Sequence, residues 1–284
     1  MGYILVDIGG TKTRVSYTDD TTVFAEPIVL STPDTPAAGL AALEDAVEQL
    51  GVSGSLQAAV IGIRGQLHED KRLLQYLQPD DPLVQWLGYP IADTLEAAWK
   101  CPVRMENDTA LAGLGETHFG AGKGFDLVVY HSVSTGVGGA RIDHGDIDHA
   151  SIGFEPGHQI LDIDRTVLGD DIAPTLENLI SGTAVAERMG VPAYEIPQTD
   201  VLWEQLAEYL GQGLRNTILY WSPEVIVLGG AMIVGDPRID VEMVRRHTVT
   251  ALDGITETPY ITKAALGDHS GLYGAMAYAQ RLGI

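Results

Sequence analysis

The first 17 residues, MGYILVDIGGTKTRVSY, contain the feature that decides the fold. An apolar strand leads into Asp7, two glycines, a threonine and Lys12, after which polar and apolar residues alternate. Alternation of this kind predicts a β-hairpin whose strands cover 3–8 and 12–18. A plain hairpin turn has no structural need for a carboxylate, a hydroxyl and an ammonium together, so we expect a ligand at its tip.

The turn has the chemistry of a phosphate site. Gly9 and Gly10 let the backbone come close to a ligand because they lack a Cβ, and successive N–H groups then form a concave anion-binding surface. Thr11 adds a hydroxyl donor and Lys12 a positive charge. The Asp7 carboxylate suits a magnesium ion held through water. We predict that these five residues bind phosphate and Mg²⁺; a simple turn is the alternative.

A second glycine turn, STGVGG at 134–139, has similar ingredients without the acid. We predict that Thr135 and Gly136 bind phosphate, and that Gly229 and Gly230 in VIVLGGAM lie close to the adenosine of a nucleotide. Ordinary turns are the alternative for both. The sequence has neither GxGxxG between a strand and a helix nor GxxxxGK[ST], so hairpins rather than a helix N-terminus would hold the nucleotide.

The order of strands and helices is repeated along the chain. A strand, a glycine turn and a second strand, followed by helices, occur near residue 9 and again near residue 136, which predicts two similar α/β lobes. The other expected strands are 22–29, 57–65 and 101–108, two within 125–143, and one within 222–232. The expected helices are 36–51, 91–100, 108–122, 174–189, 199–221, 239–251 and 269–282.

Composition excludes several classes of protein. A length of 284 residues, 45% of them apolar, is enough for a large core. The net charge of −22 would repel nucleic acid and anionic membranes, so we expect neither as a partner. A single cysteine, Cys101, excludes an internal disulfide and a multi-cysteine metal site. No apolar run spans a membrane and no basic leader is seen, which predicts a soluble, cytoplasmic protein.

Five motifs in chain order resemble one family. They are DIGGTKT (7–13), ENDTALAGLGE (106–116), STGVGG (134–139), EPGH (155–158) and VIVLGGAM (225–232). In this combination the chain strongly resembles the ROK family of bacterial sugar kinases and repressors. The resemblance implies the α/β actin-like ATPase (ribonuclease H-like) fold, with two lobes, each a mixed β-sheet flanked by helices, and with ATP and sugar meeting in a cleft.

The resemblance also implies boundaries and an activity. We expect a small lobe over 1–108, completed by 269–284, and a large lobe over 109–268. The implied reaction is phosphorylation of a hexose by ATP and Mg²⁺, typically at the 6-hydroxyl, by a homodimer. Asp108 occupies the position of the family's catalytic aspartate and would be the general base. From the residues alone it could instead be the N-cap of the following helix.

Other positions match the family's sugar-binding residues. The resemblance implies sugar contacts by Asn107, Asp108, Glu155, His158 and Glu177. The alternatives are a turn residue, a helix cap, a solvated loop and a surface glutamate. Gly65 falls where the family has a Gly-x-Pro-Gly loop near the sugar, but Arg64 replaces the proline.

One family feature is missing. Most relatives follow ExGH with a CxCGxxGC zinc module whose fourth ligand is that histidine, but here the cysteine positions hold Leu168, Asp170 and Thr175. A structural zinc needs about four N or S ligands, and only His158 is left, so we predict no structural zinc. Another acceptor must then orient the His158 ring, or the ring is less firmly held. The candidates by sequence are Asp162, Asp164, Asp170 and Asp171.

Several functions remain open on the sequence. The hexose could be glucose, N-acetylglucosamine, mannose or fructose, because epimers differ in one or two contacts. A non-catalytic sugar-binding protein of the same fold would need no base. A polyphosphate-using hexokinase would need a basic track, which 17 scattered Lys and Arg residues do not supply. A kinase for acetate or another small acid would need arginines where this chain has Asp108 and Glu155.

Overall fold

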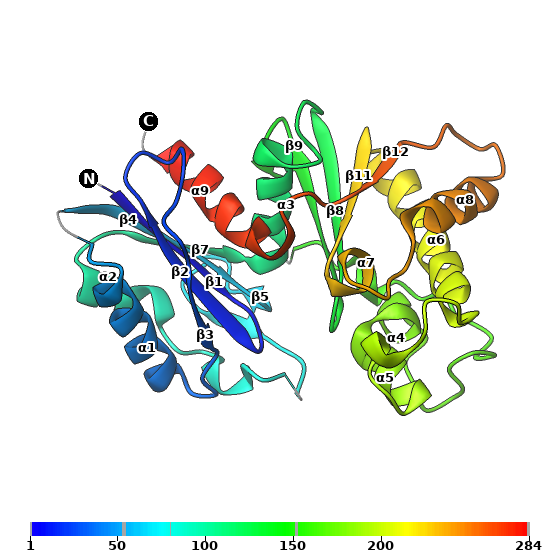
Figure 1. The fold of residues 1–284 in the computed structure, drawn as a ribbon, viewed down its shortest axis with the longest axis horizontal. Helices are drawn as coiled ribbons and strands as arrows, with labels where there is room; N and C mark the ends of the chain where they lie inside the picture. The colour runs from blue at the N-terminus through cyan, green and yellow to red at the C-terminus, as the bar shows by residue number, and fades with distance from the viewer. Residues whose placement is uncertain (1, 53–54, 80, 151–152, 283–284) are drawn as a thin grey trace. The chain divides into compact units, whose positions relative to one another are not determined.

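The computed structural model describes residues 2–52, 55–79, 81–150 and 153–282 (Figure 1). The chain forms two compact units. Unit 1 comprises Met1–His118, His149–Gly153 and Asp268–Ile284, and unit 2 comprises Phe119–Asp148 and Phe154–Gly267. Each unit contains one five-stranded mixed sheet flanked by helices, so the predicted α/β class is confirmed.

The sheet of unit 1 is built around the hairpin at the start of the chain. Its strand order is β3-β2-β1-β4-β7, where β1 is Gly2–Ile8, β2 Lys12–Thr18, β3 Ile28–Ser31, β4 Leu56–Ile63 and β7 Val103–Asn107. The β1, β2 and β3 strands pair antiparallel, whereas β1, β4 and β7 pair parallel. The carboxyl ends of three parallel strands therefore meet at one edge, which gathers the residues that follow them.

Alternation along β1 decides which side chains reach which face of this sheet. Ile4, Val6 and Ile8 belong to the core that includes helices α1 (Pro36–Gln49) and α2 (Ile91–Trp99). Because successive side chains point to opposite faces, Asp7 lies on the other face, where α9 (Ser270–Leu282) packs against β1 and β4. Figure 1 shows α9 on the opposite side of this sheet from α1 and α2. Unit 1 also contains α3 (Asp108–Phe119), η1 (Val84–Trp86), η4 (Gly267–His269, which begins in unit 2), and the β5 (Gln66–Leu67) and β6 (Leu74–Tyr76) ribbon.

Unit 2 repeats the same strand arrangement. Its sheet order is β10-β9-β8-β11-β12, where β8 is Leu127–Val133, β9 Val137–Asp143, β10 Asp146–Ile147, β11 Val225–Gly229 and β12 Tyr260–Lys263. Two antiparallel pairs are again followed by two parallel pairs. The predicted repetition of the two lobes is thus visible in the topology.

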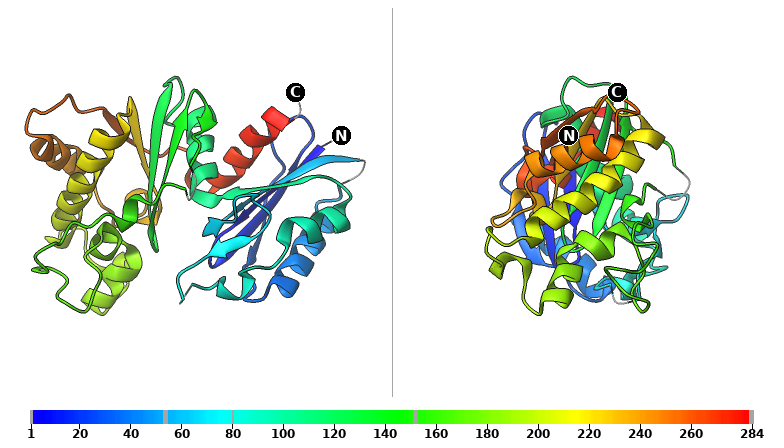
Figure 2. Two further views of the ribbon diagram at one scale, coloured as in Figure 1. Left: turned by 180° about the vertical axis from the view of Figure 1, so that it is seen from behind. Right: turned by 90° about the vertical axis from the view of Figure 1, so that its right-hand side faces the viewer.

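The helices of unit 2 cover one core. They are α4 (Leu176–Ile180), α5 (Gly182–Met189), α6 (Leu202–Trp221), α7 (Ala231–Val234) and α8 (Val241–Leu252), with short 3₁₀ turns η2 (Pro156–His158) and η3 (Ala193–Glu195). The α6 and α8 helices pack side by side, as the right-hand view of Figure 2 shows. The core of this unit combines apolar residues from β8, β11 and α6.

Some expected elements differ in the structure. Of the predicted strand 22–29 only its end is a strand, because the hydroxyl groups of Ser16 and Thr18 donate to the carbonyls of Ala25 and Val23 and replace a regular ladder there. The predicted helix 174–189 is interrupted at Ser181, which is extended and whose hydroxyl caps α5 by accepting the N–H of Ala184. The short strands β5, β6 and β12 were not predicted from the sequence.

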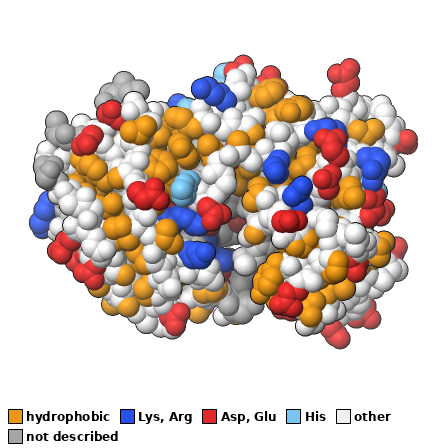
Figure 3. Space-filling model, viewed as in Figure 1, with side chains coloured by type: hydrophobic (Ala, Val, Ile, Leu, Met, Phe, Trp, Pro, Cys, Tyr) orange, Lys and Arg blue, Asp and Glu red, His pale blue; other side chains and the backbone are white. Residues whose placement is uncertain are grey.

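The surface reflects the acidic composition. On the face drawn in Figure 3, Asp and Glu side chains are scattered over each unit among Lys and Arg, as expected from acidity that is spread along the chain. None of the helices in the described part of the chain is both long enough and apolar enough to cross a lipid bilayer.

Candidate active site

The Asp7 carboxylate lies at the carboxyl edge of the unit 1 sheet, nearly buried. Its partner across the hairpin is Arg14, whose Nη1 is 3.7 Å from Asp7 Oδ2 and whose Nη2 donates to Asp268 Oδ2 at 3.1 Å. On the α9 side, a Cβ on Gly271 would lie 2.7 Å from the Asp7 carboxyl carbon. Burial, with repulsion from the Asp108 carboxylate, raises the pKa of Asp7 to about 7, although Arg14 acts in the opposite direction.

The glycine turn that follows Asp7 is closed by its own backbone. The N–H of Gly9 donates to the Lys12 carbonyl at 3.0 Å, and the Thr32 hydroxyl donates to the Gly9 carbonyl at 2.8 Å. The Lys12 side chain is exposed, as is Thr11. The structure thus forms the predicted tight turn with its ammonium and hydroxyl accessible to a ligand.

Asp108 is the first residue of α3, directly after β7. Its Oδ1 accepts the N–H of Thr109 at 2.7 Å, while the cap of the helix is Asn107, whose Oδ1 accepts the N–H of Ala110 at 3.1 Å. Burial raises the pKa of Asp108, Arg64 and the Thr109 hydrogen bonds oppose that rise, and Asp81 adds to it. Since Asn107 supplies the capping acceptor, Asp108 is not needed for that purpose.

The loop that carries Gly65 is fixed without the family's proline. Gly65 has φ +100°, and a Cβ there would lie 2.4 Å from Leu77 Cδ2, so only glycine fits both the backbone and the packing. The Asn107 side chain ties this loop to β7 by donating to the Gly65 carbonyl at 3.2 Å. The predicted residues Gly65, Asn107 and Asp108 are therefore neighbours in unit 1.

Two charged residues of this site were missed by sequence reasoning. Arg64 Nε is 3.0 Å from Oδ2 of the buried Asp81, and the Arg64 guanidinium lies against Gly10. The sequence signal for Arg64 is that it replaces the proline of the family's Gly-x-Pro-Gly loop. Arg14 was also missed, although counting across the hairpin places it opposite Asp7.

In unit 2 the second glycine turn contacts Glu177, one of the residues predicted to bind the sugar. Glu177 Oε2 accepts the N–H of Val137 at 2.7 Å and lies 2.6 Å from where a Cβ of Gly136 would be. The Ser134 N–H donates to the Gly136 carbonyl, and the Ser134 carbonyl accepts from Gly182. One N–H of the second glycine turn, that of Val137, is thus bonded to a carboxylate in this structure.

Glu155 directly precedes the η2 turn and His158 is its last residue. Glu155 Oε2 and His158 Nε2 are 3.9 Å apart. Among the described residues no aspartate bonds His158, which favours the alternative that the ring is less firmly held. Asp162, one of the candidates, instead accepts the N–H groups of Thr166, Val167 and Leu168. The carboxylate therefore organises its own loop.

The glycines after β11 have a packing role within unit 2. A Cβ on Gly229 would lie 2.2 Å from the Tyr130 hydroxyl oxygen, and one on Gly230 would lie 2.3 Å from the Val133 carbonyl oxygen. Gly230 also has φ +83°. These contacts account for both glycines, and their predicted proximity to adenosine stays a prediction.

No metal cluster emerges from the described residues. None of them form a group of three or more His, Cys, Asp or Glu side chains placed to hold an ion. The acidic stretch 143–149 contains the β9–β10 hairpin, which turns at His144 and Gly145. The Asp7 carboxylate suits Mg²⁺ through water in chemistry and position, because it lies beside the turn predicted to bind phosphate.

The chain is similar to known sugar kinases in sequence and in fold. The chain is 29% identical to a fructokinase of Pediococcus pentosaceus over 70% of its length and 71% of the relative's. It is 27% identical to the Streptomyces coelicolor glucokinase, covering 97% of this chain and 96% of that one. The crystal structure of the ROK hexokinase from Thermus thermophilus superposes with a TM-score of 0.82 at 29% identity, covering 99% of each chain.

The paired sheets described above form the actin-like ATPase fold that the resemblance implied. The sequence profile of the ROK family matches residues 3–282. The chain therefore belongs to the ROK family.

Proposed function

We propose that the protein is an ATP-dependent hexose kinase in which Asp108 is the general base and the turn after Asp7 binds the phosphates of Mg²⁺-ATP. The observation that carries the proposal is the pair of carboxylates in unit 1. Asp7 lies near the end of β1 and Asp108 directly follows β7, two parallel strands separated by β4. Burial raises the pKa of Asp7, and repulsion from Asp108 adds to that rise. Such a pair suits one carboxylate that holds a cation and one that accepts a proton.

The raised pKa of Asp108 favours proton acceptance. A base is most effective when its pKa approaches the working pH, and burial moves the carboxyl in that direction. Thr109 fixes the orientation of the carboxylate by donating its N–H. In the proposed reaction Asp108 accepts the proton of the sugar hydroxyl, expected at carbon 6, as that oxygen attacks the γ-phosphorus of ATP.

The proposed substrate class is supported by the acidic side chains of the proposed sugar-binding residues and by the activities of the relatives. The acidic residues proposed as sugar ligands, Asp108, Glu155 and Glu177, favour a neutral polyol over an anionic acceptor. The relatives are a glucokinase, a fructokinase and a hexokinase, so glucose and fructose are the first acceptors to test. Asn107, Gly65 and His158 complete the proposed sugar-binding set.

Purified protein should be assayed for ADP release with Mg²⁺-ATP over a panel of glucose, fructose, mannose and N-acetylglucosamine. We expect turnover on at least one hexose and a loss of kcat of about 100-fold or more in Asp108→Asn, with hexose affinity nearly retained. The matched control is Asp93→Asn, an exposed carboxylate of unit 1. Turnover that is undiminished in Asp108→Asn would rule out the assigned base.

The same preparation separates the alternatives. Calorimetric binding of a hexose without turnover would favour a non-catalytic sugar-binding protein. Formation of hexose phosphate with polyphosphate but not with ATP would favour a polyphosphate-using hexokinase. The oligomeric state, expected to be a dimer, can be measured on the same sample by light scattering.

A further inference from the structure

Arg64 is a cation at the carboxyl edge of the unit 1 sheet that the proposed function has not used. It directly follows β4, the strand between β1 and β7, so the topology places it between the residues that follow Asp7 and those at Asp108. Its backbone N–H donates to the Ile8 carbonyl at 3.3 Å, which fixes the chain at this point.

The Arg64 side chain is held in one direction by Asp81. Arg64 Nε and Asp81 Oδ2 are 3.0 Å apart, and the Asp81 side chain is only 5% exposed. Asp81 is itself fixed, because its Oδ1 accepts the N–H of Leu83 at 2.8 Å. A buried carboxylate paired with Nε restrains the planar guanidinium, since the group rotates as one unit.

This orientation brings the guanidinium to the glycine turn. Arg64 Nη1 would lie 2.7 Å from a Cβ placed on Gly10, so the approach requires glycine at that position. The positive charge of Arg64 also acts on Asp108, where it opposes the rise in pKa that burial causes. Arg64 therefore lies within electrostatic reach of both the proposed phosphate turn and the proposed base.

The outer nitrogens of Arg64 have no acceptor in the part of the chain that the structure describes. Its side-chain partner there is Asp81, which lies against Nε. Arg14, the other guanidinium close to Asp7, already bonds Asp268. Paired N–H donors of a guanidinium match the oxygens of a phosphoryl group.

We propose that Arg64 binds the transferring phosphoryl group, and this inference rests on the proposed kinase function. In that step the sugar hydroxyl oxygen forms a bond to the γ-phosphorus while the bond from that phosphorus to the β,γ-bridging oxygen breaks. ADP leaves with the electron pair, and Asp108 takes the hydroxyl proton. The Arg64 Nη groups donate to the equatorial oxygens of the phosphoryl group, where negative charge is spread in the transition state.

The inference predicts a loss that falls on kcat. Arg64→Ala should lower kcat about 100-fold or more while the Kd for hexose alone changes little, because the donors act chiefly in the transition state. Arg64→Lys should recover only part, since an ammonium cannot give the paired geometry. Added guanidinium at millimolar concentration should partly restore Arg64→Ala and have no such effect on the wild type. Asp81→Asn should lower kcat less than Arg64→Ala does.

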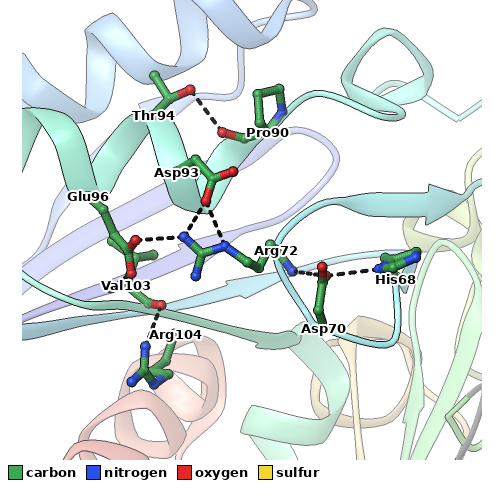
Figure 4. A network of polar contacts seen from close by, with 9 residues as sticks. All are labelled: His68, Asp70, Arg72, Pro90, Asp93, Thr94, Glu96, Val103 and Arg104. Carbon is green, nitrogen blue, oxygen red and sulfur yellow. Dashed lines mark hydrogen bonds and ion pairs between the residues drawn. The ribbon is translucent and has the colours of Figure 1, made fainter.

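Arg72 offers a matched control in the same unit. Its side chain is 31% exposed against 32% for Arg64, and it also binds carboxylates of a neighbouring element, Asp93 and Glu96 (Figure 4). That network lies on α2 and the loop that contains His68 and Asp70. Arg72→Gln should reduce thermal stability without changing kcat, so it reports the effect of losing an arginine ion pair alone.

A second measurement does not depend on turnover. Binding of ADP, Mg²⁺, aluminium fluoride and hexose together imitates the transferring group, and calorimetry should show that Arg64→Ala weakens this complex far more than it weakens ADP alone. Equal weakening of both, or a kcat like that of the wild type, would overturn the inference. If Arg64→Ala loses activity only with hexose 6-phosphate or another anionic acceptor, then Arg64 recognises the acceptor and not the transferring group. A wild type without kinase activity, and without the fluoride complex, would refute the proposed function and this inference with it.

Discussion

The carboxyl carbon of Asp7 on β1 lies so close to Gly271 on α9 that a Cβ on that glycine would be 2.7 Å from it. A contact under 3 Å forces one side to move, and here the mobile side is the carboxylate. Gly271→Ala should therefore displace Asp7 from the proposed Mg²⁺-phosphate site. Because alanine is the better helix former, α9 itself should remain intact.

We expect Gly271→Ala to lower kcat/KM for Mg²⁺-ATP by about 10–100-fold, the usual scale for a small displacement of a positioned group. Steady-state kinetics with varied nucleotide measure it. The control is the same substitution in an Asp7→Ala background, where it should add little, because the carboxylate that it displaces is gone. Equal effects in both backgrounds would show that Gly271 matters for another reason.

A separate consequence of the Asp7 environment is a stability penalty at neutral pH. The pKa of Asp7 is about 7 in the folded protein, through burial first and Asp108 second, against an ordinary value of 3.8. Between these values the unfolded chain releases the proton while the folded protein keeps it, so stability falls as the pH rises and the loss is complete above pH 7. Its size is on the order of 4 kcal/mol.

Asp7→Asn removes this penalty. The variant should unfold at a higher temperature than the wild type at pH 8 and at about the same temperature at pH 4, measured by calorimetry without nucleotide or Mg²⁺. The same substitution should abolish most of the kinase activity, since asparagine cannot balance the ion's charge. A lower unfolding temperature of Asp7→Asn at pH 8 would contradict the assigned cost of the carboxylate.

The sequence predicted this part of the molecule well because local rules apply there. Alternation and a glycine turn predicted the β1–β2 hairpin, and the same pattern recurring near residue 136 predicted the second lobe. Asp7, Asn107 and Asp108 could be placed together because each comes at the end of a strand. Strand ends gather at one edge whenever those strands pair parallel.

What the sequence could not predict depends on contacts between distant residues. Arg64 and Asp81 are separated in the chain by the β5–β6 ribbon, and no sequence pattern predicts their ion pair. The break between α4 and α5 at Ser181 follows from a cap that interrupts an otherwise helical sequence. Asp162 was a candidate partner of His158, but its carboxylate accepts three N–H groups of its own loop instead. Sequence spacing alone does not reveal which of these partners a carboxylate binds.

The Asp162 loop leads to a prediction about metal. Its carboxylate accepts the N–H groups of Thr166, Val167 and Leu168 and thereby holds the segment that replaces the family's zinc module. Asp162→Asn would place an NH₂ group against these donors, so the unfolding temperature should fall by about 2 °C or more. Treatment with a chelator should leave that temperature unchanged in the wild type. A fall that zinc reverses would mean that a metal holds the segment after all.

The fully buried His131 should make the protein sensitive to acid. Its Nε2 lies 3.1 Å from the Thr217 hydroxyl, which itself donates to the Gly213 carbonyl, so Nε2 carries the proton. Its Nδ1 has no partner among the described residues, so protonation there would add a buried donor without an acceptor. Burial lowers the pKa of His131 to about 4 from an ordinary 6.5.

The pH dependence of stability that His131 causes has the opposite sign to the one that Asp7 causes. As the pH falls from 6.5 to 4, the unfolded chain takes up the proton and the folded protein does not, so stability falls by on the order of 3 kcal/mol. In the wild type the effects of Asp7 and His131 on stability have opposite signs over nearly the same range of pH, so they largely cancel. His131→Leu should therefore leave a protein that gains stability as the pH falls from 7 to 4, because the raised pKa of Asp7 then acts without the opposing effect of His131, and Thr217 keeps its bond to Gly213. Urea unfolding at pH 7, 5.5 and 4 measures this, and Asp7→Asn should show the reverse slope. Parallel slopes in the two variants would mean that neither group controls the pH dependence.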